Sequence, residues 1–152
     1  MTTQLQVNSL STLYDEDFML WLENNINLLK NGKFNQLDLE NLIEELESMG
    51  KSDKRALRSN LTILLMHLLK YKYQRNKRSN SWERTIGEHR DRLQDALIYS
   101  PSLNRFFDDV FHQCYQKARK NAAKETKLSL SVFPPECPFT QIEVLTEDFL
   151  PE

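Results

Sequence analysis

The part of the sequence that most constrains the fold is residues 61–84, where the apolar segment LTILLMHLLK runs directly into the basic, aromatic segment YKYQRNKRSNSWER. Apolar residues recur in the first segment at spacings of three and four, which predicts a helix with one buried face. The second segment is rich in lysine and arginine, which are rarely buried without a partner. We therefore expect a long core helix that ends at a solvated basic connection.

Composition favours an all-helical soluble protein. The 152 residues suffice for one domain, and three glycines are too few for the many tight turns of a β-sandwich. Two cysteines, Cys114 and Cys137, do not make a disulfide scaffold and suit a reducing compartment. The start of the chain lacks the pattern of a secretory signal, and the longest apolar run, residues 63–66, is far too short to span a bilayer. We expect a cytoplasmic protein that does not enter the membrane.

Three helices are predicted before residue 75. Asp15 is a suitable N-cap for the first, and Gly32 follows its end. The second spans about 37–49 and ends at Gly50, after which Ser52 can cap the long third helix. The expected buried faces are Phe18, Trp21, Leu22, Ile26 and Leu29; Leu39, Leu42, Ile43, Leu46 and Met49; and Leu57, Leu61, Leu64, Leu65 and Leu68.

Two further helices and an irregular tail follow. Asn80 with Glu83 reads as a capping box for the fourth helix, and Ser100-Pro101 marks the start of the fifth. Their expected faces are Trp82, Ile86, His89, Leu93 and Leu97, and Leu103, Phe107, Val110, Phe111, Cys114, Tyr115 and Ala118. Three prolines exclude regular helix over residues 129–139, and a short closing helix is expected over 140–148. The predicted fold is a flexible arm over 1–12 and one all-α domain over 13–152, a bundle of about five helices with a proline-rich extended C-terminal segment.

With these segments in view, the chain resembles a bacterial family, abundant in cyanobacteria, named domain of unknown function number twenty-nine. The resemblance covers nearly the whole chain and rests on YDEDF…W at 14–21, LDLENLIEELESMG at 37–50, LLMHLLKYKYQ at 64–74, SW at 81–82, SPSL at 100–103 and the tail FPPECPF…LTEDFLPE. It implies an all-helical single domain and carries no established activity.

Charge is unevenly distributed, and this suggests binding rather than chemistry. Residues 13–47 have a net charge of −7, whereas residues 51–92 have a net charge of +8. Opposite charge blocks suit docking to a complementary partner, which could be another protein or a second copy of the chain. Bases interleaved with aromatics can also bind single-stranded nucleic acid, although the pI near 6 argues against it. The candidate binding residues are Lys70, Lys72, Tyr73, Arg75, Lys77, Arg78, Trp82 and Arg84.

Candidate catalytic residues are few. His89 lies at the centre of its helix's apolar face and His67 at the edge, whereas His112 points away from the core. A buried imidazole bonded to a carboxylate, hydroxyl or carbonyl is the simplest interpretation of His67 and His89. Glu45 is expected to pair with Arg55 or Arg58 across a turn at Gly50. No helical glutamate–histidine spacing predicts a metal site, and no cofactor motif is present.

The sequence thus favours a non-enzymatic interaction module for a macromolecule, with protein as the expected partner. Nucleic-acid binding through residues 70–84 is the first alternative. A small hydrolase or nuclease that uses His67 or His89 with Glu45 is the second.

Overall fold

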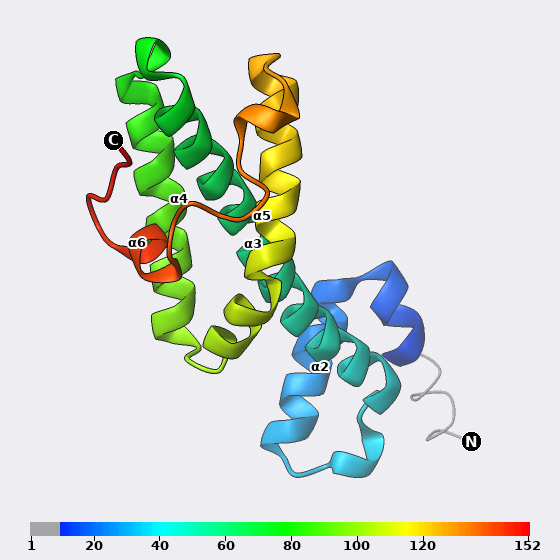
Figure 1. Cartoon of the computed structure of the whole chain (residues 1–152). Coiled ribbons are helices and arrows are strands. Elements are labelled where there is room, and N and C mark those ends of the chain that lie inside the picture. Colours follow the sequence, from blue (N-terminus) through cyan, green and yellow to red (C-terminus); the bar gives the residue numbers. More distant parts are fainter. Residues whose placement is uncertain (1–9) are drawn as a thin grey trace. The chain divides into compact units, whose positions relative to one another are not determined.

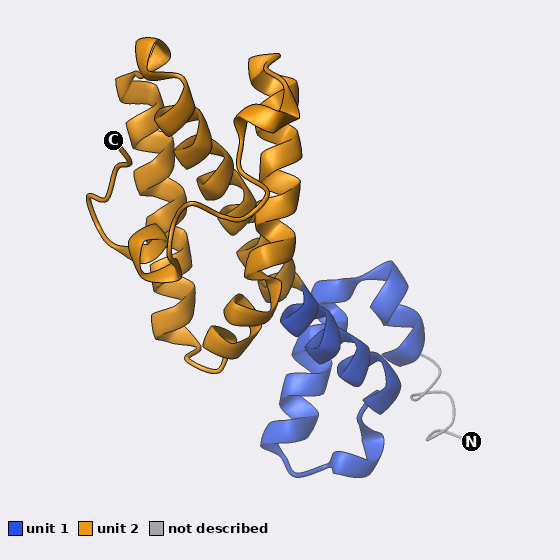
Figure 2. Ribbon diagram, viewed as in Figure 1, with its two compact units in different colours: residues 1–51 blue, residues 52–152 orange. Residues whose placement is uncertain are grey.

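A computed structural model describes residues 10–152, and within that range the protein is helical, without β-strands. The chain forms two compact units, residues 1–51 and residues 52–152 (Figure 2). The predicted all-α fold is confirmed, although the sequence placed residues 13–152 in one domain. Most of the predicted arm lies outside the described residues, but residues 10–12 are helical and Leu10 is buried.

Unit 1 contains a helix over residues 10–16, α2 (Phe18–Lys30), a 3₁₀ turn η1 (Phe34–Gln36) and the first part of α3 (Leu39–Tyr73). Asp15, the predicted N-cap, lies inside the first of these helices. The N-cap of α2 is instead Asp17, whose side chain accepts a hydrogen bond from the Leu20 amide at 3.1 Å. Gly32 has a φ of +70°, which agrees with its predicted place just beyond the helix end.

The predicted burial of unit 1 is wrong. In its described part, the buried residues are Leu10, Trp21 and Asn25. The helical spacing of the apolar residues is as expected, but most of them face solvent because no element of the unit covers them. Seven of the ten predicted core residues are exposed: Phe18, Ile26, Leu29, Leu39, Ile43, Leu46 and Met49.

Gly50 does not end a helix, which corrects the predicted break between residues 49 and 52. The helix α3 runs for 35 residues and passes through this position (Figure 1). A glycine inside a helix costs only about 1 kcal/mol relative to alanine, so it does not by itself interrupt the backbone hydrogen bonds. The flanking sequence contains good helix formers on both sides.

Replacing Gly50 with alanine should raise the free energy of unfolding by about 0.5–1 kcal/mol, because alanine has less backbone freedom to lose. A Cβ atom at this position would meet no atom within 4 Å. G32A is the control of opposite sign, since Gly32 has a positive φ that alanine adopts only with strain. Urea denaturation of the two variants should move the midpoints in opposite directions; a destabilised G50A would contradict a continuous, uncrowded α3.

Unit 2 contains the remainder of α3, the 3₁₀ turn η2 (Arg75–Lys77), α4 (Asn80–Tyr99) and α5 (Leu103–Thr126). Here the predicted faces pack together, and one core joins all three helices. It includes Leu57, Leu61, Leu64, Leu65 and Leu68 of α3, Ile86, Leu93 and Leu97 of α4, and Phe107, Val110, Phe111, Cys114, Tyr115 and Ala118 of α5. The N-cap of α4 is Ser79 rather than the predicted Asn80, and its side chain accepts from the Trp82 amide at 3.2 Å.

The C-terminal segment crosses α5 and α4 (Figure 1). It contains η3 (Leu130–Val132), an irregular stretch and the closing helix α6 (Gln141–Leu145), which Thr140 and Glu143 begin with the predicted capping box. Phe133, Phe139 and Val144 insert into the core of unit 2.

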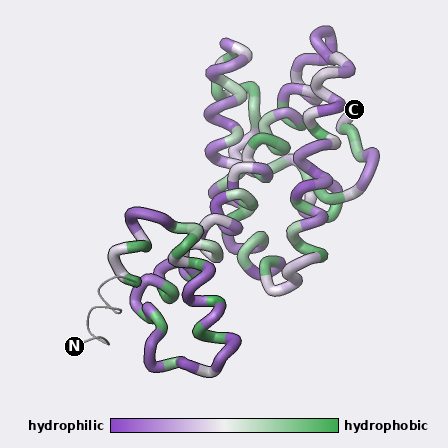
Figure 3. Tube along the Cα trace, turned by 180° about the vertical axis from the view of Figure 1, so that it is seen from behind, coloured by the Kyte–Doolittle hydropathy of each residue, from purple (hydrophilic) through white to green (hydrophobic). Residues whose placement is uncertain are grey.

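Apolar and polar residues alternate along the helices of both units (Figure 3). Within residues 10–152, no helix is long and apolar enough to cross a membrane.

Candidate functional site

The basic segment over residues 70–84 includes the end of α3, η2 and the start of α4. Its side chains have three kinds of environment. Arg75, Lys77 and Arg84 are exposed, and Lys72, Tyr73, Arg78 and Trp82 are partly buried. Lys70 is buried. The sequence predicted one binding surface for these residues. In the structure they differ in exposure and in the groups that they contact.

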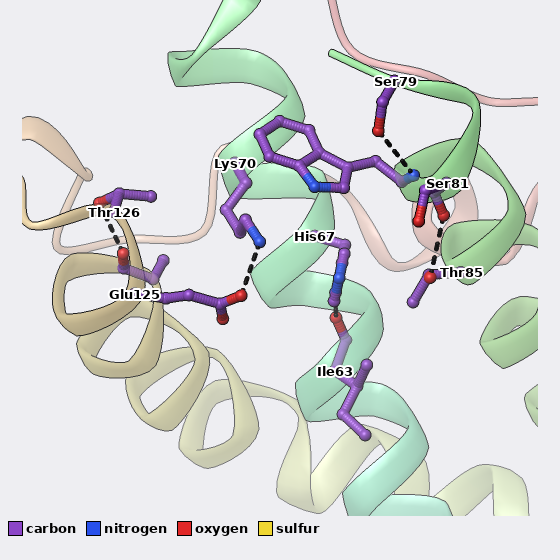
Figure 4. A network of polar contacts seen from close by, with 10 residues as sticks. Ile63, His67, Lys70, Ser79, Ser81, Thr85, Glu125 and Thr126 are labelled. Atoms are coloured by element: carbon purple, nitrogen blue, oxygen red, sulfur yellow. Dashed lines mark hydrogen bonds and ion pairs between the residues drawn. The ribbon is translucent and has the colours of Figure 1, made fainter. Parts of the chain in front are cut away.

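Lys70 belongs to the core rather than to an exposed surface. Its Nζ atom lies 2.9 Å from Glu125 Oε1 on α5 and 4.6 Å from the centroid of the Trp82 ring. Figure 4 shows the ammonium between the elements that carry these groups, close to His67. A carboxylate and an aromatic face are both favourable neighbours for a buried cation. Lys70 therefore joins α3, α4 and α5 and has no exposed charge for a ligand.

Arg75 and Arg78 bind the end of the described chain. Arg75 Nη2 donates to the Glu152 carbonyl at 2.9 Å, and Arg78 Nη2 donates to the Pro151 carbonyl at 3.2 Å. Arg78 also donates from Nε to the Tyr71 carbonyl at 2.7 Å, with its guanidinium 4.2 Å from the Tyr71 ring centroid. These two predicted binding residues thus have intramolecular partners, and Lys72, Lys77 and Arg84 are the cations left for an external ligand.

The two candidate histidines both belong to unit 2 and are partly buried. His67 Nδ1 donates to the Ile63 carbonyl at 3.0 Å (Figure 4), whereas His89 Nδ1 lies 2.8 Å from Asn60 Oδ1. Both acceptors are oxygens, so the proton of each neutral ring lies on Nδ1. Burial lowers the pKa of both imidazoles below the ordinary value of 6.5, and Lys70 lowers that of His67 further. The expected carbonyl-bonded imidazole is confirmed for His67, and the partner of His89 is a side-chain amide.

The free energy of unfolding should fall as the pH drops, because His67 and His89 have lowered pKa values in the folded protein. Because their folded pKa values lie below 6.5, the unfolded chain binds more protons as the pH drops below that value. Their contribution to the free energy of unfolding is fully present above pH 6.5 and is lost as the pH falls toward their pKa values in the folded protein. H89Q should therefore show a shallower decline of unfolding free energy than the wild type between about pH 7 and pH 5. Equal slopes in H89Q and the wild type would contradict the buried-imidazole assignment.

Glu45 is not paired with Arg55 or Arg58, which corrects the sequence prediction. It accepts a hydrogen bond from the Tyr14 hydroxyl at 2.5 Å, and this bond raises the pKa of Tyr14 to about 12. Glu45 lies in unit 1, whereas His67 and His89 lie in unit 2. No turn at Gly50 exists to bring Glu45 back toward the arginines.

The thiols are not poised for nucleophilic chemistry. Both are free, and burial raises the pKa of Cys114 and that of Cys137, the latter to about 11. A thiol is a nucleophile chiefly as its thiolate, which is disfavoured here. Among residues 10–152, no group of three or more histidine, cysteine, aspartate or glutamate side chains could hold a metal ion.

Sequence reasoning missed the residue that anchors the closing segment. Arg90 is 3% exposed, and its Nε and Nη2 atoms donate to the carbonyls of Val144 and Phe149 at 2.8 and 2.9 Å. Its only sequence signal is its position next to His89, close to the apolar face of α4. The backbone carbonyls that it binds carry no residue-specific pattern.

Comparison with known proteins places the chain in a family. No curated protein and no solved structure matches it significantly. The family resemblance inferred from the motifs is confirmed, because the model of Domain of unknown function DUF29 matches residues 13–150. This match covers nearly the whole chain, and the protein therefore belongs to that family.

Proposed function

We propose that the protein is a non-enzymatic interaction module whose docking surface is the apolar face of unit 1. The supporting observation is the density of exposed large apolar side chains there. They are Phe18, Met19, Leu20, Ile26, Leu29, Phe34, Leu39, Ile43, Leu46 and Met49. Unit 2 is about twice as long, and its described surface exposes only Ile98, Tyr99, Leu130, Val132 and Ile142. Exposed apolar side chains at this density are typical of sites that bind another protein.

The charges around this surface favour a particular partner. On α3, Leu39, Ile43 and Leu46 follow one another along one helical face, at spacings of four and three. Glu40, Glu44 and Glu47 each follow one of these residues, so they line one side of this ridge. We therefore propose a protein partner that presents an amphipathic helix with apolar residues flanked by lysine or arginine. A second copy that docks through the same face would bring acidic flanks together, and nucleic acid would meet like charge.

The alternatives that the sequence left open are less well supported. For nucleic acid, Lys70 is paired with Glu125, and Arg75 and Arg78 use donors on backbone carbonyls, which reduces the donors that residues 70–84 can offer to phosphate. For a hydrolase, the Nδ1 protons of His67 and His89 are bonded to oxygens of the protein itself. The free cysteines support a reducing compartment, and we propose the cytoplasm.

A synthetic amphipathic peptide tests the docking surface directly. We expect a helix with a leucine stripe and lysine flanks to bind the full chain in calorimetry. The double variant I43Q/L46Q should weaken this binding at least about tenfold. In the wild type, the peptide buries the apolar side chains of Ile43 and Leu46, and the variant loses the free energy of that burial. I142Q is the matched control, since Ile142 is 80% exposed in unit 2.

Two comparison peptides make the result decisive. A peptide with lysine flanks and a serine stripe should bind poorly, and so should one with a leucine stripe and glutamate flanks. Equal binding of the serine peptide would mean that charge alone is recognised, and the proposal would be wrong. Concentration-dependent self-association in light scattering, abolished by I43Q/L46Q, would instead identify a second copy as the occupant.

A further inference from the structure

A groove between α3 and α5 of unit 2 has an unusual lining. Its volume is about 560 Å³, within the usual range for small-molecule sites. Arg55 and Arg58 line it from α3, and Lys117 lines it from α5. The other side chains that can hydrogen-bond a ligand there include Ser59, Gln113 and Asn121.

The groove carries positive charge without compensation. No aspartate or glutamate lines it, and among residues 10–152 none of its three cations forms an ion pair. A second cavity of about 600 Å³, lined by α3 and α4, provides a contrast. There Asp53 and Asp95 accompany Arg92. Of these two cavities, the α3–α5 groove is the one with an uncompensated positive lining.

Helical spacing places the groove's polar residues on one face of α3 and one face of α5. Arg55, Arg58 and Ser59 share one face of α3, because they lie three and four residues apart. Gln113, Lys117 and Asn121 lie four residues apart along α5 and line the opposite wall. Polar groups from two rigid helices therefore converge on the space between them.

Two local contacts involve Arg58 of the groove. The Arg58 guanidinium lies 5.4 Å from the centroid of the Phe106 ring, a cation–π contact that limits its freedom. Cys114 lines the groove from α5, and its sulfur lies 3.8 Å from the Arg58 carbonyl. Burial raises the pKa of this thiol, whereas Arg58 and Lys117 oppose the rise. These two cations thus favour negative charge at that point.

We propose that the α3–α5 groove binds a small molecule that carries phosphate groups, with the phosphates held between Arg58 and Lys117. Arginine offers paired donors that match phosphate oxygens, and lysine adds a point charge. Three cations suit a multiply charged anion such as a diphosphate. The hydroxyl and amides of Ser59, Gln113 and Asn121 supply neutral donors for the remaining oxygens. This site shares no residue with the proposed docking surface of unit 1.

Calorimetry of the full chain with inorganic pyrophosphate tests this site. We expect one molecule to bind per chain, with an affinity that falls as salt rises from about 50 to 200 mM. R58Q and K117Q should each weaken binding by about tenfold or more, because each removes a charge-assisted contact. R105Q is the matched control, since Arg105 is an exposed arginine on α5 outside the groove. It should bind as the wild type does.

Three outcomes would overturn the proposal. These are no binding of pyrophosphate at millimolar concentration, an equal loss in R105Q, and tighter binding of a decaglutamate peptide than of pyrophosphate. The last would assign the groove to an acidic protein segment. Circular dichroism should show unchanged helicity in R58Q and K117Q, and retained binding by either folded variant would also contradict the assignment. The variant I43Q/L46Q should bind pyrophosphate normally, so failure of one proposal can be told from failure of the other.

Discussion

Replacing Arg90 with methionine should lower the free energy of unfolding by about 2–4 kcal/mol, because two carbonyls then lose a charged donor. Arg90 is buried on α4, and its guanidinium binds the carbonyls of Val144 and Phe149. Methionine preserves much of the apolar stem but offers no hydrogen bond. The expected loss therefore measures the polar contacts rather than packing.

The magnitude follows from two opposing effects. A hydrogen bond to a charged group contributes about 1.5–3 kcal/mol, so two such bonds represent a large stabilisation. Burial of the charge opposes it, because desolvation of a cation is unfavourable. This same desolvation lowers the pKa of Arg90. The net effect is destabilising because methionine removes the donors but leaves the two carbonyls in place.

R92M is the control for this prediction. Arg92 lies two residues further along α4, is 53% exposed and pairs with Glu88 at 2.6 Å. An exposed ion pair contributes at most about 1 kcal/mol, so R92M should unfold close to the wild type in urea. Hydrogen exchange of R90M should quicken first over residues 140–150, which Arg90 holds to α4. Equal stabilities of the two variants would show that the closing segment does not depend on Arg90.

Unit 2 was predictable because its helices pack against one another. Leu57, Leu61 and Leu64 recur at helical spacing and are all buried. Ile43 and Leu46 recur in the same way within unit 1 but remain exposed. Periodicity shows that a helix has an apolar face and does not show what covers that face. The sequence therefore predicted burial correctly only in unit 2, and in unit 1 it missed the helix over residues 10–16 and the continuity of α3 through Gly50.

The candidate site was less predictable because its partners are distant in the sequence. Lys70 and Lys77 both belong to the basic segment, but only Lys70 meets Glu125, which lies 55 residues away. Arg75 and Arg78 bind backbone carbonyls 77 and 73 residues away. A carbonyl has no residue-specific signature, so these contacts could not be inferred from the sequence. Only the fold distinguishes a structural cation from an available one.

Replacing Trp21 with alanine should unfold unit 1, because the expected loss of about 3–5 kcal/mol is large for so small a core. Trp21 is fully buried, and its indole Nε1 donates to Asp38 Oδ2 at 2.9 Å. Tyr14 and Phe18 pack on its ring, with centroid distances of 4.9 and 5.4 Å. The buried amide of Asn25 completes this core, because it accepts from the Asp38 amide at 3.1 Å.

Hydrogen exchange measured by mass spectrometry can locate the effect of W21A. Exchange should accelerate over residues 18–49, whereas α4 and α5 should keep their protection because Trp21 contributes nothing to the core of unit 2. F34A is the control within the same unit, since Phe34 is 62% exposed. It should cost less than about 0.5 kcal/mol.

The conservative variant W21F separates packing from hydrogen bonding. Phenylalanine keeps an aromatic ring beside Tyr14 and Phe18 but loses the donor to Asp38, so a smaller cost of about 1–2 kcal/mol is expected. Asp38 would still accept from Asn41 Nδ2 at 2.7 Å, which limits the penalty. If W21A instead loosened α4 and α5 as much as residues 18–49, the two units would unfold as one. Unit 1 could then no longer be regarded as a separately stabilised docking element.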